Sequence, residues 1–188
     1  MLKYLEEGCK YVEITGFRGA ETGDAKDLLN AIRGQMPEGA EAQFFDADLI
    51  ATWQHLYFAV VNALMAFRTK RNVSKSLAVE VMLYASAQRQ IKKAIALIGV
   101  KSSSTNVAAV ILGESAESAE VALCAAAKCL RANPDERVLE LSAEKAERIK
   151  RAFDVGEVEL ETARTKDNAE KALVDAVVER VALLSTRL

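Results

Sequence analysis

The longest hydrophobic stretch of the chain covers residues 49–65. Its apolar side chains point nearly all the way round a helical projection: Leu49, Ile50, Trp53, Leu56, Tyr57, Val60, Val61, Leu64 and Met65. A helix that is apolar all round is normally buried at the centre of a domain. Gln54, His55 and Asn62 favour a buried helix over a membrane span. We therefore expect a central helix, with the Asp48 carboxylate capping its first turn.

Shorter patterns predict most of the remaining elements. Runs rich in β-branched and aromatic residues predict strands at 11–17, 42–45, 107–112 and 137–141. Apolar residues at helical spacing predict helices at 24–33, 115–130 and 142–153. A terminal helix follows, with an apolar stripe formed by Leu173, Val177, Val181 and Leu184. Residues 154–167 give no clear pattern.

The segment 77–98 contains no proline or glycine and has two interpretations. It is either one helix or two helices with a kink near Ser86. The polar residues 68–76 before it predict an exposed connection, in which Ser76 can cap the next helix. The expected core face holds Val79, Met82 or Leu83, Ser86 or Ala87, Ile91, Ile95 and Ile98.

These elements predict an α+β fold: a mainly helical single domain over residues 1–188, with a small mixed or antiparallel sheet of about four short strands. The length of 188 residues is enough to bury a sizeable core without disulfides or metal. Residues 1–10 are a segment that could be flexible.

The three cysteines, Cys9, Cys124 and Cys129, are an odd number, and two lie in an alanine-rich run. This usage is typical of buried, reduced thiols in a cytosolic protein. The first residues carry acids where a signal peptide needs an apolar region. Both observations predict a cytoplasmic protein.

Positive charge is gathered in one part of the chain. Residues 66–104 hold eight basic residues and one acid, Glu80, which gives this segment a net charge of +7. Since the whole chain has a formal net charge of −2, the rest carries −9. Such asymmetry indicates an anionic partner.

Motifs for catalysis or cofactor binding are missing. With one histidine, the chain cannot build a metal site from several imidazoles, and Cys124 and Cys129 are off a common helical face. Neither a GxxxxGK[ST] loop nor a GxGxxG after a strand is present. We expect no metal, no cofactor and no enzymatic activity.

Several ordered sequence words resemble one known family. They are FRGA (17–20), ADLIAT (47–52) followed by His55, ASAQRQI (85–91), IGVK (98–101) and VVERV (177–181). Together they resemble the PRPK-binding protein (TPRKB) family, the small non-catalytic subunits of the archaeal and eukaryotic KEOPS complex. The family commonly has glycine where this chain has Ala87, which would matter if that position needs a special backbone angle.

The resemblance implies a subunit that docks on the kinase-like ATPase of the complex and binds the single-stranded 3′ CCA tail of tRNA. The complex makes threonylcarbamoyladenosine in tRNA, and a different subunit carries out the transfer. From the residues themselves, we expect neither a membrane nor a metal among its partners.

Arg89, between Gln88 and Gln90, is the first candidate for RNA binding. A guanidinium can pair with phosphate and stack on a base, while amides can read base edges. From the sequence alone, a solvated helix start is the favoured interpretation, and the resemblance reverses that preference. The other RNA-binding candidates are Lys70, Arg71, Ser74, Lys75, Ser76 and Lys93.

Each candidate has an alternative interpretation. The basic residues could form a solubilising loop, and the hydroxyl of Ser76 could simply cap a helix. Trp53, Tyr57 and Tyr84 could stack on bases, although aromatic residues at helical spacing are more often core. For His55 a structural hydrogen bond is favoured.

The stripe of Leu173, Val177, Val181 and Leu184 could dock on the kinase-like subunit or pack in the core. A second functional hypothesis is a purely protein-binding regulator of that subunit, with no RNA contact. A third is an enzyme acting on a phosphorylated metabolite, with Arg89, His55 and Ser76 around an anion.

Overall fold

Four antiparallel strands form one sheet, in the order β1-β2-β4-β3, in the computed structural model, which describes residues 2–163 and 169–186. The strands are β1 (Leu2–Leu5), β2 (Lys10–Arg18), β3 (Glu41–Asp46) and β4 (Asn106–Gly113). The helices are α1 (Ala25–Arg33), α2 (Trp53–Arg68), α3 (Leu77–Ala85), α4 (Ile91–Ile98), α5 (Ala116–Leu130), α6 (Ala143–Phe153), α7 (Glu157–Ala163) and α8 (Ala169–Leu183). Short 3-10 turns are η1 (Ala47–Leu49), η2 (Glu136–Leu139) and η3 (Leu184–Thr186). The predicted α+β class is confirmed.

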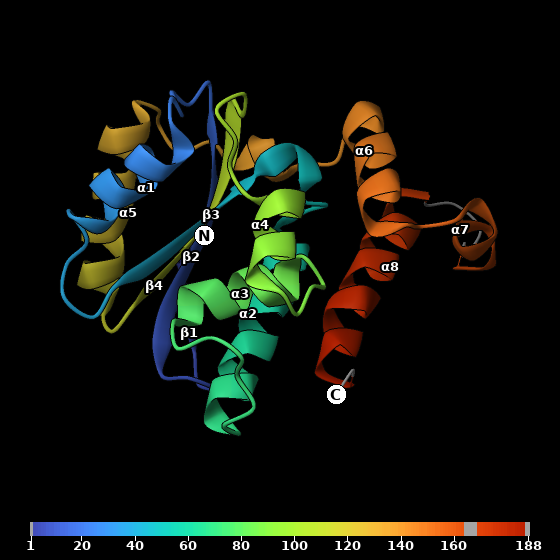
Figure 1. The fold of residues 1–188 in the computed structure, drawn as a ribbon, viewed down its shortest axis with the longest axis horizontal. Helices are drawn as coiled ribbons and strands as arrows, with labels where there is room; N and C mark the ends of the chain where they lie inside the picture. The colour runs from blue at the N-terminus through green and yellow to red at the C-terminus, as the bar shows by residue number, and fades with distance from the viewer. Residues whose placement is uncertain (1, 164–168, 187–188) are drawn as a thin grey trace.

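The central strand β4 separates two helical layers. Side chains alternate along a strand, so Val107, Ala109 and Ile111 face one side, where α1 and α5 pack. Residues 108, 110 and 112 face the larger core, which contains α2, α3, α6 and α8. Figure 1 shows α1 and α5 on one side of the sheet and the other helices on the opposite side.

The apolar stretch forms α2 as predicted, but it is not buried all round. Trp53, Phe58 and Met65 are 37%, 41% and 40% exposed. The predicted cap at Asp48 is also wrong, because this residue lies in η1 and α2 begins after Thr52. The Asp48 carboxylate instead accepts a hydrogen bond from Arg148 of α6 at 2.8 Å.

The segment 77–98 forms two helices, the second of the two interpretations. The chain turns between them at Ala87, whose φ of 51° is in the left-handed region and cannot continue a helix. Ser76 caps α3 as predicted. In α4 the expected core face is confirmed at Ile98, which is buried, but it is wrong at Ile91 and Ile95, which are exposed. Ala94 is buried instead, because the break shifts the helical phase.

The predicted strand at 137–141 is wrong, since η2 occupies most of it. The Asp135 carboxylate accepts from the Arg137 amide and starts a tight turn there. Val138 then packs on β2, where a Cβ placed on Gly16 would come within 2.7 Å of the Val138 Cβ. The fourth strand is instead β1, which pairs with β2 through a hairpin.

The C-terminal helices are held together by Arg180 of α8. Its guanidinium donates to the carbonyls of Phe153 and Asp154 and to the Glu159 carboxylate of α7. Part of the region without a predicted element therefore forms α7, and 164–168 lie outside the described residues.

The cysteines are free but not buried as expected. Cys9 and Cys124 are exposed, and Cys129 is half-buried, because the apolar face of α5 is built mainly from its alanines and leucines. Among the described residues, none of the helices combines the length and the hydropathy needed to cross a membrane.

Candidate nucleic-acid interface

A pocket of about 500 Å³ brings together three of the predicted RNA-binding residues, Arg71, Gln88 and Arg89. It lies between α2, α3 and the end of the described chain. Its other lining residues are Asn62, Met65, Ala66, Thr69, Val73, Glu80, Leu83, Tyr84, Leu184, Ser185 and Thr186. Amides, hydroxyls and two guanidinium groups therefore surround an apolar floor, a lining suited to a small polar ligand.

Glu80 is the one acid of the basic segment, residues 66–104, and it fixes the loop of residues 70–75, which borders the pocket. Its buried carboxylate accepts from the amide of Val73 at 3.0 Å and from that of Ser74 at 2.8 Å. Because these two backbone amides donate to a charged carboxylate, the hydrogen bonds are strong and order the loop beside Arg71.

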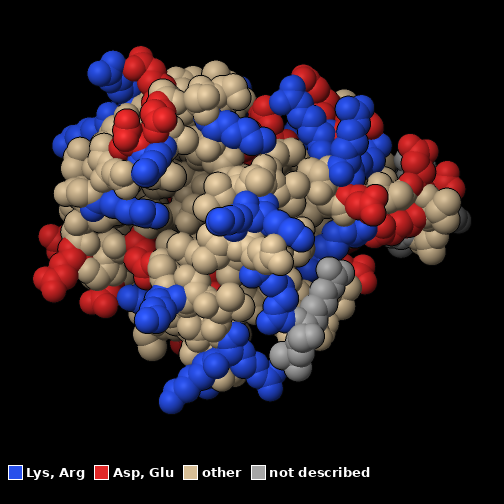
Figure 2. Space-filling model, viewed as in Figure 1, with Lys and Arg blue, Asp and Glu red and all other residues tan. Residues whose placement is uncertain are grey.

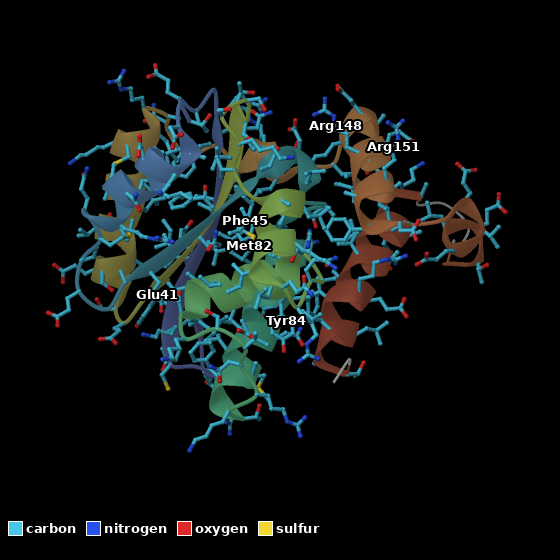
Figure 3. All side chains as sticks on the ribbon, in the orientation of Figure 1. Glu41, Phe45, Met82, Tyr84, Arg148 and Arg151 are labelled. Atoms are coloured by element: carbon cyan, nitrogen blue, oxygen red, sulfur yellow. The ribbon has the colours of Figure 1, made fainter. Side chains whose placement is uncertain are left out.

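Ser74 and Ser76, both predicted to bind RNA, form hydrogen bonds within the loop and at the start of α3. The Ser74 hydroxyl accepts from the Ser76 amide, and the Ser76 hydroxyl accepts from the Val79 amide and donates to Glu41 of β3. Figure 3 shows Glu41 on the sheet edge beside α3. The cap is the role of Ser76 seen in the structure, and neither serine lines the pocket.

His55 supports the turn that carries Gln88 and Arg89. The Ala51 amide donates to its Nδ1, so Nε2 carries the proton and donates to the Ala85 carbonyl. Burial lowers the pKa of His55 to about 4, so the ring is neutral at pH 7. This is the structural hydrogen bond favoured from the sequence.

Tyr84 joins the pocket from α3, on the side that faces α8 (Figure 3). Burial raises the pKa of its phenol, the Glu80 charge raises it further, and Arg89 opposes the shift. The phenol therefore stays protonated and can donate a hydrogen bond. Tyr84 as a whole is only 7% exposed, which leaves little of its ring for stacking.

The positive charges of the basic segment are exposed and are not neutralised by salt bridges with the described residues. All eight of its lysines and arginines are exposed, and none forms a salt bridge within the described residues. Figure 2 shows lysine and arginine side chains over α4 and the lower end of α2, with few acids among them. Because Glu80 is buried, the field over this face is positive.

Besides the two serines, four predicted RNA-binding residues lie outside the pocket. Lys70 and Lys75 are the first and last residues of the loop 70–75, while Gln90 and Lys93 lie at the start of α4. All four are exposed, and none lines the pocket. Their contribution to binding stays a prediction.

Sequence reasoning missed the part of the site that depends on tertiary structure. Met65, expected in the core, is an exposed apolar residue at the pocket. Leu184, Ser185 and Thr186 arrive from the far end of the chain, and no local pattern indicates that position. Glu80 did carry a signal, as the only acid among eight basic residues.

The terminal stripe packs inside this chain. Leu173, Val177, Val181 and Leu184 are between 0% and 7% exposed and belong to the larger core. This is the core-packing alternative, and it leaves these side chains little surface to offer a partner.

The described residues contain no group of three or more histidine, cysteine or acidic side chains that could hold a metal ion.

A family model described as kinase binding protein CGI-121 matches residues 23–185. The chain belongs to this CGI-121 family. The family resemblance drawn from the sequence is thereby confirmed at the level of a kinase-binding regulatory family.

A curated relative supports the same assignment. The regulatory protein Cgi121 of Methanocaldococcus jannaschii is 35% identical over 88 residues, which are 47% of this chain. The matched part spans about half the length of that relative, 52%.

Proposed function

We propose that this protein is a non-catalytic KEOPS subunit that binds a kinase-like ATPase and the 3′ CCA tail of tRNA. In this role it supports the modification of tRNA to threonylcarbamoyladenosine in the cytoplasm. The observation that carries the RNA part is the pocket lined by Arg71, Gln88 and Arg89, which belong to a segment with eight exposed basic residues.

The chemistry of this surface suits a single-stranded RNA end. Exposed lysines and arginines attract the phosphates, and a pocket accepts a base that is free of its stack. The Arg89 guanidinium offers a plane for stacking, and the Gln88 amide offers both a donor and an acceptor to a base edge. Met65 adds an apolar contact.

Binding of tRNA with and without its CCA tail tests the proposal. We expect removal of the tail to weaken binding by at least about tenfold, since single bases stacked or paired in a pocket contribute roughly 1–3 kcal/mol each. Equal affinity for both tRNAs would contradict tail recognition.

A protein-only regulator is the second candidate. It is favoured by the family description, which names kinase binding and no nucleic acid. In that case the basic surface would meet an acidic surface of the kinase-like protein. Salt-sensitive binding of that protein, together with no detectable tRNA shift, would favour this candidate over the first.

A further inference from the structure

A groove of about 1100 Å³ lies away from the RNA-binding candidates. It runs between the start of α2, η2 with the residues after it, and the first half of α8. Its lining residues are Ile14, Thr52, Trp53, Gln54, Phe58, Glu136, Arg137, Leu139, Glu140, Leu141, Glu170, Lys171, Val174, Asp175 and Val178. None of them lines the pocket of Arg89.

The floor of the groove is apolar and includes two exposed aromatic side chains. Trp53 and Phe58 are 37% and 41% exposed, although α2 is otherwise the central helix of the core. Aromatic residues exposed in a concave, apolar surface are typical of the buried centre of protein interfaces.

Two buried polar atoms at this groove have no hydrogen-bond partner. They are the hydroxyl oxygen of Thr52 and the side-chain carbonyl oxygen of Gln54. Thr52 stands at the N-cap of α2, yet its side chain makes no capping bond. Both residues line the groove and are partly exposed there.

The rim is mainly acidic. Its lining carries four carboxylates, from Glu136, Glu140, Glu170 and Asp175, against the two basic residues Arg137 and Lys171. A third basic residue is close by, since the Lys3 ammonium lies 5.2 Å from the centroid of the Trp53 ring. Glu140 and Asp175 are exposed and form no salt bridge with the described residues. An RNA backbone would be repelled here, whereas lysines and arginines of a protein would be attracted.

We propose that this groove docks an amphipathic segment of the kinase-like partner, with apolar side chains against Trp53 and Phe58 and basic side chains on the rim. This inference rests on the kinase binding in the proposed function and adds the surface and the chemistry of its occupant.

Separate surfaces allow both ligands to bind at once. The groove uses the first halves of α2 and α8, and the RNA-binding pocket uses the end of α2 and the residues after α8. Kinase binding through the groove therefore leaves Arg89 free. A complex of all three components is the expected state.

Binding of the purified kinase-like partner to designed variants tests the inference. Phe58→Arg places a positive charge on the groove floor, and Val121→Arg makes the same change at a 48% exposed position on α5, across the sheet. We expect Phe58→Arg to weaken kinase binding by at least about tenfold, and Val121→Arg to change it less than about twofold. Affinity for tRNA should be unchanged in both.

A second variant avoids any change to packing. Reversing the exposed charges together, in Glu140→Lys/Asp175→Lys, should also weaken kinase binding by at least about tenfold at low salt. If wild type binds the kinase and all three variants bind it equally well, the groove is not the docking surface, and the proposed function is unaffected. If wild type binds no kinase, both proposals fail.

Discussion

The Nε2 atom of His55, in the first turn of α2, lies 2.7 Å from the carbonyl oxygen of Ala85, the last residue of α3. Two residues later, Ala87 turns the chain toward Gln88 and Arg89. His55 is buried and does not line the pocket, but it holds the backbone that leads to Gln88 and Arg89, the main RNA-binding candidates.

Acid should weaken the fold through this histidine. The folded-state pKa is about 4, below the ordinary 6.5, so the unfolded chain binds more protons between these values. Stability therefore falls as pH falls, and the loss from this group between pH 7.5 and pH 5 is about 2 kcal/mol. Urea unfolding at both pH values measures it. His55→Gln should be less stable at pH 7.5 and less dependent on pH, and an unchanged pH dependence would contradict the assignment.

Ala87→Gly should stabilise the protein. A left-handed residue with a Cβ is strained, and glycine relieves the strain at some cost in unfolded-state entropy, for a net gain of about 0.5–1 kcal/mol. Ala96→Gly, at an exposed position within α4, should instead lose about 1 kcal/mol. Thermal or urea unfolding of both variants tests this, and effects of the same sign would be inconsistent with strain at Ala87.

Arg89→Glu should weaken tRNA binding and leave the fold intact, because Arg89 is exposed and forms no salt bridge with the described residues. We expect at least about a tenfold loss in affinity and a decrease of about 1 in the slope of log affinity against log salt. Lys26→Glu, an equal charge change in the first turn of α1 across the sheet, is the control. Similar losses in both variants would indicate only a general effect of charge.

Glu80→Gln should loosen the loop of residues 70–75. The substitution removes the charge that strengthens the bonds from Val73 and Ser74, at a cost of about 1–3 kcal/mol. Hydrogen exchange should show faster exchange of these two amides, with little change after Glu120→Gln on the exposed side of α5. Unchanged protection would mean that the loop does not depend on this carboxylate.

Long, strongly patterned segments were predictable from the sequence. The strand 107–112 and the helix 115–130 are found within a residue of their predicted limits, because burial on both faces and a serine cap leave clear local signals. The η2 turn was not predictable as such, since its shape depends on Val138 lying against Gly16 of another element.

The candidate site also has a part that the sequence could indicate and a part that only the structure reveals. Charge and motif indicated Arg71, Gln88 and Arg89, which the fold brings to one pocket. Ser74 and Ser76 have the right chemistry for phosphate, but their hydroxyls are used within the loop and by Glu41. Only the tertiary structure distinguishes a free hydroxyl from one already paired.

The helices α2 and α8 pack against each other and run in the same direction (Figure 1). The groove lies at its start and the RNA-binding pocket at its end, and the 16 residues of α2 span about 24 Å. A partner in the groove and an RNA end in the pocket would thus be held at a fixed distance and angle. One residue inserted in the middle of α2 would rotate one site against the other by about 100°. If both proposals hold, the length of α2 would set the distance between the bound partner and the bound RNA end.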